Sequence, residues 1–336
     1  MFLHVELDAR PDRAAARARE LAEAGVDGLF TFEGRHDVFL PLAAAAAVTD
    51  VELMTNVAIA LPRSPLHLAH AAYDLQLISS GRFRLGLGSQ IRPHIESRYG
   101  STWGRPAARM RETVLAVRAI FDAWQHQSRL KFHGEFTKHT LMPPAFNPGP
   151  NPFGMPPIYL GALGPVMTRS AGEVADGLLV MPFHSVRHFR ERTLPAVDAG
   201  LSQTGRSRSD FDIVPQVIAA MGDTEDELAA ATAGVRQLLA FYGSTPAYAP
   251  VLDIEGRADL QPELNALSKR NDVPAMTELI DDCLVTTLAV RGTPAECGRE
   301  IVNRFGDVAQ RVCVYFPGYD VATDQIASLA AALHAV

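Results

Sequence analysis

The feature that most constrains the fold is a regular alternation of short apolar strands with helical segments. Eight segments have the composition of buried strands: residues 2–7, 26–32, 51–61, 82–88, 157–162, 177–181, 211–221 and 311–316. Helical patterns separate them, as expected where parallel strands form one sheet and helices cover it. Eight such units predict an α/β fold, a (β/α)8 TIM barrel. At 336 residues the chain is long enough for one such domain, spanning residues 1–336.

Two segments interrupt the alternation. Residues 129–156, after the fourth strand, are rich in Pro, Gly, Asn and Phe and predict an excursion with a hairpin. Residues 242–282, after the seventh strand, predict a second, irregular insertion. A doubly wound open sheet is the rival fold. It is set aside because the glycine pair Gly86 and Gly88 lacks the third glycine of the dinucleotide fingerprint and lies on the fourth strand.

Charge and cysteine content narrow the expected partners. The net charge of −7 argues against a nucleic-acid or anionic-membrane binder. Residues 82–138 nevertheless hold nine Arg and two Lys against four acidic residues (11 − 4 = +7), which suits an acidic small molecule. Three cysteines without a CxxC pattern, no apolar leader and no apolar run of about 18 residues predict a cytoplasmic protein with a small-molecule substrate.

Polar residues gather where strands end, and in a barrel these ends form the catalytic face. The loop after the second strand contains Glu33, His36 and Asp37, in which an imidazole titrating near neutrality has a carboxylate beside it. These three are the candidate catalytic residues, and the alternative is that His36 is an ordinary exposed loop histidine. The third strand contains Asn56, which disfavours regular pairing and indicates either a bulge facing a ligand or a residue at the barrel end.

Two further loops offer binding groups. After the fifth strand, the segment Gly161, Ala162, Leu163, Gly164 precedes Pro165, and free backbone N–H groups at this helix start would suit a phosphate. His184 and His188 have the i, i+4 spacing of a metal pair on a helix, but no third ligand is evident. Surface histidines and no metal are therefore expected.

Four segments taken together resemble the luciferase-like monooxygenase superfamily, and most closely its branch that uses the deazaflavin coenzyme F420. They are TFEGRHDVFLPLA, VELMTNVAIALPRSPLHLA, GRFRLGLGSQIRPHIESRYG and PIYLGALGPVMTRSAGEVADG. The resemblance spans residues 2 to about 319. It implies a (β/α)8 barrel, often a homodimer, with the cofactor across the barrel mouth, where it performs hydride transfer.

Carried over residue by residue, the resemblance assigns a cofactor site. Thr55, Asn56 and Val57 would lie at the ring, with a cis peptide bond between Asn56 and Val57. Ser89, Gln90 and His94 would flank the ring and its side chain, and residues 161–165 would hold the phosphate. One departure concerns the proton donor, because Gly34 stands where related enzymes have a histidine after the acid. Either His36 takes that role, or Glu33 does, or the substrate is reduced without such an acid.

The expected function is hydride transfer between F420 and a small organic substrate. Two alternatives stay open at this point. One is an FMN-dependent monooxygenase that uses reduced flavin and O₂, and the other is a barrel that binds flavin without turnover. A barrel hydrolase is disfavoured, because neither metal ligands nor a nucleophile motif is evident.

Overall fold

The computed structural model describes residues 1–335 and contains a closed barrel of eight parallel strands. They are β1 (Phe2–Glu6), β2 (Gly28–Thr31), β3 (Glu52–Thr55), β5 (Phe83–Gly88), β8 (Ile158–Ala162), β9 (Gly177–Val180), β10 (Asp212–Met221) and β12 (Arg311–Tyr315). Each strand pairs with the next in this order, and β12 pairs with β1 to close the ring. The predicted (β/α)8 barrel is confirmed.

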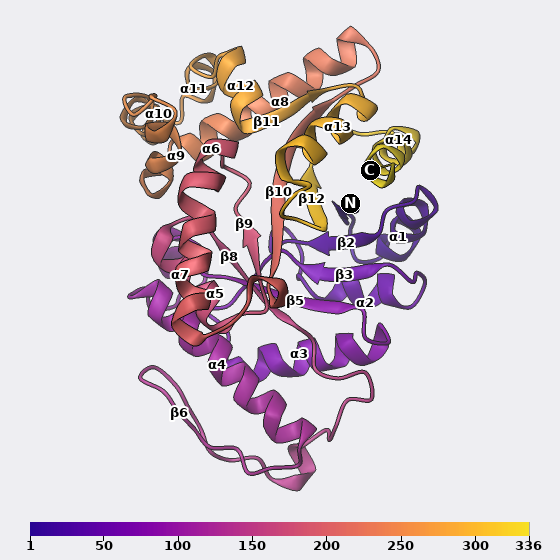
Figure 1. Cartoon of the computed structure of the whole chain (residues 1–336), viewed down its shortest axis with the longest axis vertical. Coiled ribbons are helices and arrows are strands. Elements are labelled where there is room, and N and C mark those ends of the chain that lie inside the picture. The colour runs from indigo at the N-terminus through magenta and orange to yellow at the C-terminus, as the bar shows by residue number, and fades with distance from the viewer. Residues whose placement is uncertain (336) are drawn as a thin grey trace.

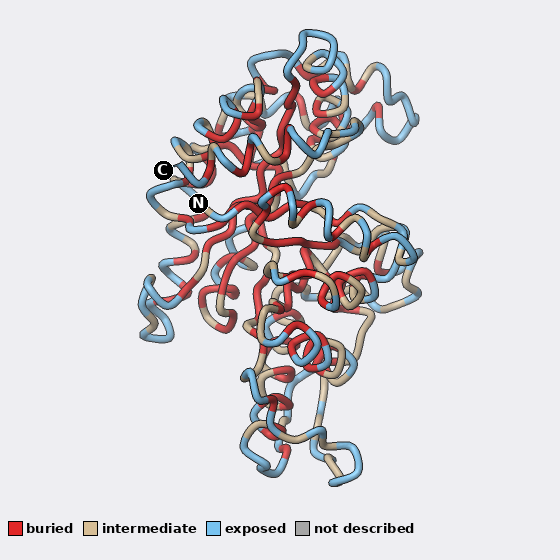
Figure 2. Tube along the Cα trace, turned by 90° about the vertical axis from the view of Figure 1, so that its right-hand side faces the viewer, coloured by how far each residue is buried: buried red, intermediate tan, exposed pale blue. Residues whose placement is uncertain are grey.

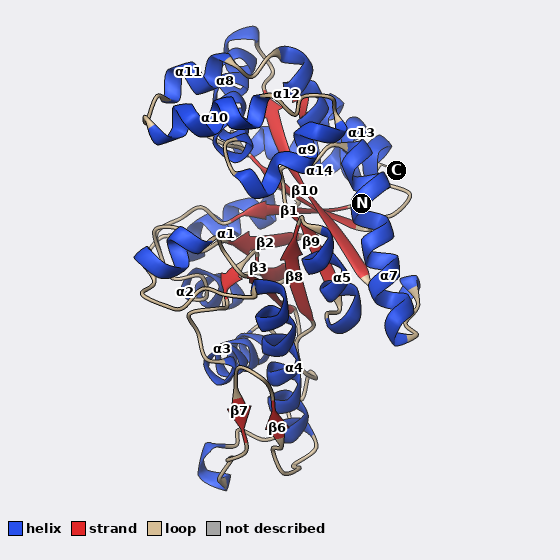
Figure 3. Cartoon of the chain, turned by 90° about the vertical axis from the view of Figure 1, so that its left-hand side faces the viewer, coloured by secondary structure: helices blue, strands red, loops and turns tan. Residues whose placement is uncertain are grey.

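Helices surround the barrel, and buried residues are concentrated along its strands (Figures 2 and 3). The helices between strands are α1 (Ala14–Glu23), α2 (Leu40–Ala46), α3 (Pro65–Ile78), α4 (Pro106–Gln125), α5 (Pro165–Val174), α6 (Val186–His188), α7 (Leu194–Thr204), α8 (Glu225–Gly243) and α13 (Pro294–Phe305). The chain ends in α14 (Thr323–His334), and the amino group of Met1 donates to the carbonyl of Leu333 at 2.8 Å. The two termini therefore lie side by side (Figure 1).

The third strand is shorter than predicted, because a break divides it. β3 ends at Thr55, the peptide bond between Asn56 and Val57 is cis, and a two-residue strand β4 (Ala58–Ile59) follows. β3 and β4 both pair with β5. The bulge at Asn56 and Val57 therefore separates two stretches of hydrogen bonding to the same strand. The expected bulge and cis bond are confirmed.

The two insertions lie at opposite ends of the molecule's long axis (Figure 1). The first contains the predicted hairpin, β6 (Phe132–His133) with β7 (Lys138–His139), which lies along α4. The second is helical where an irregular segment was predicted, with α9 (Ala249–Ile254), α10 (Leu260–Lys269), α11 (Val273–Glu278) and α12 (Asp282–Leu288). It leads into β11 (Ala289–Gly292), a strand the sequence pattern missed, which extends the sheet beside β10. Short apolar runs at helical spacing bury this insertion on α8.

Over residues 1–335, no helix has both the length and the apolarity needed to span a bilayer.

Candidate active site at the barrel mouth

The mouth is the ring of loops at the carboxyl ends of the strands, and Glu33 lies in it as part of a network. The Glu33 carboxylate accepts hydrogen bonds from Arg63 Nη1 at 2.6 Å, from the backbone N–H of Ile59 at 2.8 Å and from the Tyr99 hydroxyl at 3.0 Å. Its side chain is only 8% exposed. These bonds tie the loops after β2, β4 and β5 together. Glu33 is therefore well placed to hold the mouth in shape.

His36 and Asp37 lie on the same loop, and both are exposed. Asp37 Oδ1 accepts from the backbone N–H groups of Phe39 and Leu40, at 2.8 and 3.0 Å, and so satisfies the start of α2. Within residues 1–335 the His36 ring has no hydrogen-bond partner, so Asp37 does not orient it as the sequence suggested. A catalytic role for His36 stays a prediction.

Thr55 joins strands at the bulge and does not face the mouth. It is fully buried, and its hydroxyl donates to the carbonyl of Gly86 at 2.8 Å and accepts from the Gly86 N–H at 2.9 Å. A Cβ on Gly86 would lie 1.9 Å from the Thr55 carbonyl oxygen, so only glycine fits beside this bulge. Thr55 therefore shapes the bulge, and the residues after it reach the mouth.

Val57 occupies a notch made by two glycines. A Cβ on Gly88 would lie 2.4 Å from Val57 Cγ2, and one on Gly161 would lie 3.1 Å from Val57 Cγ1. Val57 itself is half-buried. The missing side chains on β5 and β8 thus allow the bulge to bring Val57 over the end of the barrel, where a flat ring could rest on it.

The residues after β5 form a tight turn. Gln90 has a left-handed φ of 60°, its Oε1 accepts from the N–H of Ile91, and the Ser89 hydroxyl donates to the Gln90 carbonyl. His94 is half-buried at the start of a short helical turn, His94–Arg98. Ser89 and Gln90 thus directly follow Gly88, the glycine against which Val57 packs, and His94 comes four residues after Gln90 in the same loop.

The segment from Gly161 to Gly164 connects β8 to α5. The side chains of Ala162 and Leu163 are buried, so these two residues can offer only backbone groups to a ligand. Gly164 is the exposed N-cap of α5, where no side chain caps the helix and no acidic residue lies in the first turn. In that turn the Thr168 hydroxyl is fully buried and has no partner within the described chain. The helix start is thus open to an anion.

A chain of hydrogen bonds crosses the barrel just below the mouth. Asn56 Nδ2 donates to the Tyr315 hydroxyl at 3.0 Å, and that hydroxyl donates to Gln216 Oε1 at 2.6 Å. Burial holds the pKa of Tyr315 well above its ordinary value, so the phenol stays neutral. Asn56 Oδ1 is buried without a partner in the described chain. The chain joins the β3 wall to the opposite β10 and β12 wall and leaves one acceptor unused.

Glu6, at the end of β1, is a site residue that the sequence analysis missed. It follows His4 by two residues, and alternation along a strand puts both side chains inside the barrel. Burial raises the pKa of Glu6 to about 7, with a smaller contribution from Asp8. Among residues 1–335 its carboxyl has neither a hydrogen-bond donor nor a cation beside it. Glu6 can therefore exchange a proton near neutral pH.

Tyr242 and Tyr315, from distant parts of the chain, lie near enough to this carboxyl to feel its charge. Burial, Tyr248 and the charge of Glu6 together raise the pKa of Tyr242, and Glu6 also acts on Tyr315. The rings of Tyr242 and Tyr248 lie 6.1 Å apart, and each packs on Phe183. The β1, β10 and β12 side of the mouth is therefore aromatic and phenolic, opposite the Val57 notch.

The basic stretch of residues 82–138 is largely neutralised in the folded chain. Arginines 82, 84, 92, 105, 111 and 118 each pair with a carboxylate. Arg98 bonds instead to the carbonyl of Gly34 at 2.8 Å, at the rim of the mouth. Only part of the charge excess counted in the sequence thus remains for an acidic ligand.

The expectation that His184 and His188 are surface residues is wrong. Both are buried, with exposed fractions of 4% and 3%. Burial lowers the pKa of His184 to about 4, and its Nδ1 contacts the carbonyl of Met181 at 2.8 Å. In the described part of the chain no three His, Cys, Asp or Glu side chains are grouped to hold a metal. These histidines fill the packing beneath α6 and α13.

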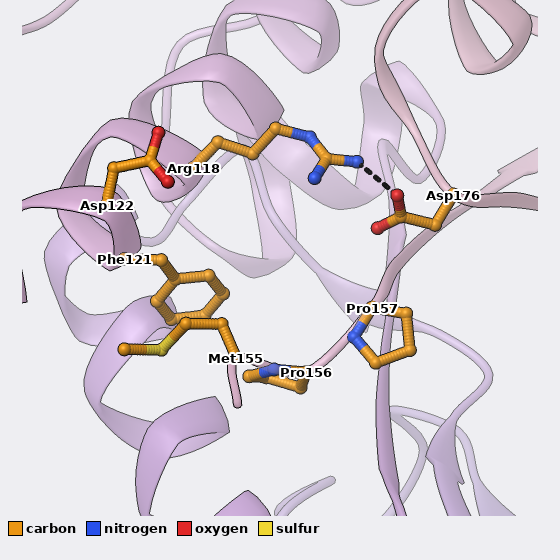
Figure 4. Close-up of a pocket in the computed structure, with 7 residues that line it drawn as sticks. All are labelled: Arg118, Phe121, Asp122, Met155, Pro156, Pro157 and Asp176. Atoms are coloured by element: carbon orange, nitrogen blue, oxygen red, sulfur yellow. Dashed lines mark hydrogen bonds and ion pairs between the residues drawn. The ribbon is translucent and has the colours of Figure 1, made fainter. Parts of the chain in front are cut away.

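A cavity of about 330 Å³ lies at the other end of the barrel (Figure 4). Arg118 of α4 pairs there with Asp176 at 2.7 Å, beside Pro157. Pro157 and Asp176 directly precede β8 and β9, so this cavity opens at the amino ends of the strands. Active sites of such barrels lie at the carboxyl ends, so we place the site at the mouth.

A family model described as luciferase-like monooxygenase matches residues 3–310. The chain belongs to the luciferase-like monooxygenase family. A putative coenzyme F420-dependent oxidoreductase of Mycobacterium tuberculosis is 32% identical over 304 residues, which cover 84% of each chain. An uncharacterized protein of the same species is 47% identical over 305 residues and covers 90% of each chain. The family is thus shown, with enzymes among its members.

Solved structures agree with the fold. The coenzyme F420-dependent tetrahydromethanopterin reductase of Methanopyrus kandleri matches with a TM-score of 0.77 over 98% of this chain and 96% of that chain, at 19% identity. At that identity the match supports the barrel alone.

The mouth has features that fit a flavin-like cofactor of the luciferase-like family. The missing side chains on β5 and β8 make room for Val57, which is half-buried at the end of the barrel and offers an apolar surface for a ring. A Cβ on Gly164 would meet nothing within 4 Å, so the start of α5 is open for a phosphate. Asn56 Oδ1, next to Val57 in the chain, is a buried acceptor without a partner among residues 1–335.

Proposed function

We propose that this protein is an F420-dependent oxidoreductase that transfers a hydride between the deazaflavin and a small organic substrate. The observation that carries the proposal is the unpaired Glu6 carboxyl at the mouth, with its pKa raised to about 7. Reduction of a C=O or C=N bond needs a hydride at carbon and a proton at the heteroatom. The bound deazaflavin supplies the hydride chemistry, and Glu6 supplies the proton.

Each remaining site residue has a positional role in this proposal. Val57 supports the ring from the bulge, and Ser89, Gln90 and His94 border it. The end of β8 and the turn before α5, residues 161–164, receive the phosphate through backbone N–H groups. Glu33 is bonded to Arg63, to the Ile59 N–H and to the Tyr99 hydroxyl, and it fixes the loops of the mouth.

The choice of F420 over FMN rests on the related oxidoreductase and on the sequence resemblance. The remaining cationic groups at the rim, such as Arg98, would favour a cofactor with an acidic tail. Side-by-side titrations of the purified protein with F420 and FMN, at 50 and 200 mM salt, test this. We expect F420 to bind more tightly and to lose affinity as salt rises. Tighter FMN binding, or F420 binding without salt dependence, would contradict it.

A further inference from the structure

A groove of about 410 Å³ runs along α8. Its walls are Leu238 and Phe241 of α8, Val273 and Met276 of α11, and Pro317 after β12. Phe241 is 56% exposed and Val273 is 38% exposed, so large apolar side chains face water from both walls. The polar lining residues are Gln237, Ser268 and Asn271, and none of the charged side chains within residues 1–335 lines the groove. This volume and lining are typical of a site for an uncharged small molecule.

The groove is adjacent in sequence to the mouth at two places. Phe241 precedes Tyr242, whose phenol lies within reach of the Glu6 charge, and the rings of Phe241 and Tyr242 are 5.8 Å apart. Pro317 follows Tyr315 by two residues, and Tyr315 belongs to the hydrogen-bonded chain below the mouth. A Cβ on Gly234 would lie 2.0 Å from the Pro317 carbonyl oxygen, so α8 packs directly on the loop after β12. The groove and the Glu6 side of the mouth therefore share α8 and the loop after β12, while Glu6, Tyr242 and Tyr315 themselves do not line the groove.

We propose that the α8 groove binds the apolar, uncharged part of the substrate while its reducible group reaches Glu6. This inference rests on the proposed function for the identity of the reaction, and it names the substrate class. The occupant is a molecule with an apolar body and a carbonyl or imine, and it carries no phosphate or carboxylate. An anionic substrate would find no cation among the residues that line the groove. Near Glu6 it would also be repelled whenever that carboxyl is ionised.

Two ring-matched probes test the class of ligand on the full-length protein. They are 2-acetylnaphthalene, which is uncharged, and 2-naphthyl phosphate, an anion with the same ring. Binding is measured by titration without cofactor, so it does not depend on F420. We expect the uncharged probe to bind at least tenfold more tightly. Equal or tighter binding of the phosphate, or no binding of the uncharged probe to the wild type, would overturn the proposal.

Matched variants locate the site. Phe241→Asp and Val273→Asp each place a charge in the groove at an exposed position, and both should weaken the uncharged probe at least tenfold. Ala229→Asp adds the same charge to an exposed position of α8 outside the groove and should leave binding unchanged. Thermal melts check that all three are folded, and F420 affinity is measured in each.

The two proposals can fail separately. If F420 binds neither the wild type nor any variant while the probe results are as expected, the cofactor proposal fails and the groove assignment stands. If Phe241→Asp and Val273→Asp bind the probe like the wild type, the groove assignment fails.

Discussion

The two ends of the barrel interior place a half-buried carboxyl in opposite surroundings. At the amino end, Glu52 lies 2.7 Å from Arg84 and 3.4 Å from Arg311, and Arg311 pairs with Asp212 at 2.5 Å. Burial would raise the pKa of Glu52, but the contact with His4 and the two arginines outweigh it and hold the pKa at about 2. At the carboxyl end, Glu6 has no such partner in the described part of the chain, and burial raises its pKa to about 7.

This difference separates a structural layer from a reactive one. The compensated layer, made of Glu52, Asp212, Arg84 and Arg311, keeps its charges at all ordinary pH values and closes the amino end of the barrel. The uncompensated carboxyl of Glu6 can gain or lose a proton under working conditions, which is what a proton donor requires. An apolar layer that includes Phe30, Met54 and Cys313 lies between the two, and within residues 1–335 no hydrogen bond or ion pair joins Glu6 to the Glu52 network. Changes to the hydrogen bonds and ion pairs at one end should therefore leave those at the other end in place.

The largest effect should come from Glu6→Gln, which removes the proton donor and keeps the shape. We expect turnover to fall on the order of 10²–10⁴-fold with F420 affinity retained. His36→Asn in the same assay separates the two candidates for the proton. A large loss of turnover in His36→Asn together with an active Glu6→Gln would reverse the assignment.

Glu52→Gln should act on stability. It leaves Arg84 and Arg311, whose side chains are 16% and 8% exposed, without the carboxylate between them. We expect a loss of about 3 kcal/mol in the free energy of unfolding, measured by urea denaturation, with unchanged turnover per folded molecule. Asp50→Asn removes a fully exposed carboxylate nearby and should change stability by less than about 0.5 kcal/mol. Similar losses in both variants would argue against a compensated layer.

Stability should depend on pH in opposite directions at the two ends. The folded pKa of Glu6 is raised from 4.5 to about 7, so the folded state loses up to about 3 kcal/mol as pH rises through that window. The folded pKa of Glu52 is lowered from 4.5 to about 2, so its stabilisation is lost as pH falls through that window. Unfolding of Glu6→Gln relative to wild type at pH 5 and pH 8 checks the first. A stability difference that does not grow with pH would refute it.

A smaller effect should follow from filling the notch around Val57. In Gly88→Ala the new Cβ would lie 2.4 Å from Val57 Cγ2, so Val57 must move and cofactor affinity should fall about tenfold. Gly161→Ala brings its Cβ only to 3.1 Å from Val57 Cγ1 and should cost less. Cofactor titrations of both variants measure this. The reverse order of losses would show that the notch does not position the ring.

Local pattern and resemblance predicted much of this molecule. The alternation of strand and helix patterns identified the barrel, since each strand is short, apolar and bounded by a helix. The resemblance located the bulge at Asn56 and Val57. The helices of the second insertion were missed because proline and glycine divide them into short pieces that become helical only when packed on α8.

Glu6 was missed for a different physical reason. In sequence it is one acidic residue at the end of a strand. Its raised pKa comes from burial in a mouth that also holds Tyr242, Tyr248 and Tyr315, more than 230 residues away. The role of Asp37 was likewise hidden, because its partners are backbone N–H groups that become available only where α2 begins. Neither property is encoded in spacing along the chain.

The most direct test of the contrast between the two ends is the titration of Glu6 itself. Protein labelled with ¹³C at the glutamate carboxyl carbons can be followed by NMR from pH 4 to pH 9. The resonance missing from the Glu6→Gln spectrum belongs to Glu6. The account predicts that it titrates with a midpoint of about 7. A midpoint near 4.5, the value of an ordinary exposed glutamate, would contradict the claim that the mouth keeps an uncompensated carboxyl for proton transfer.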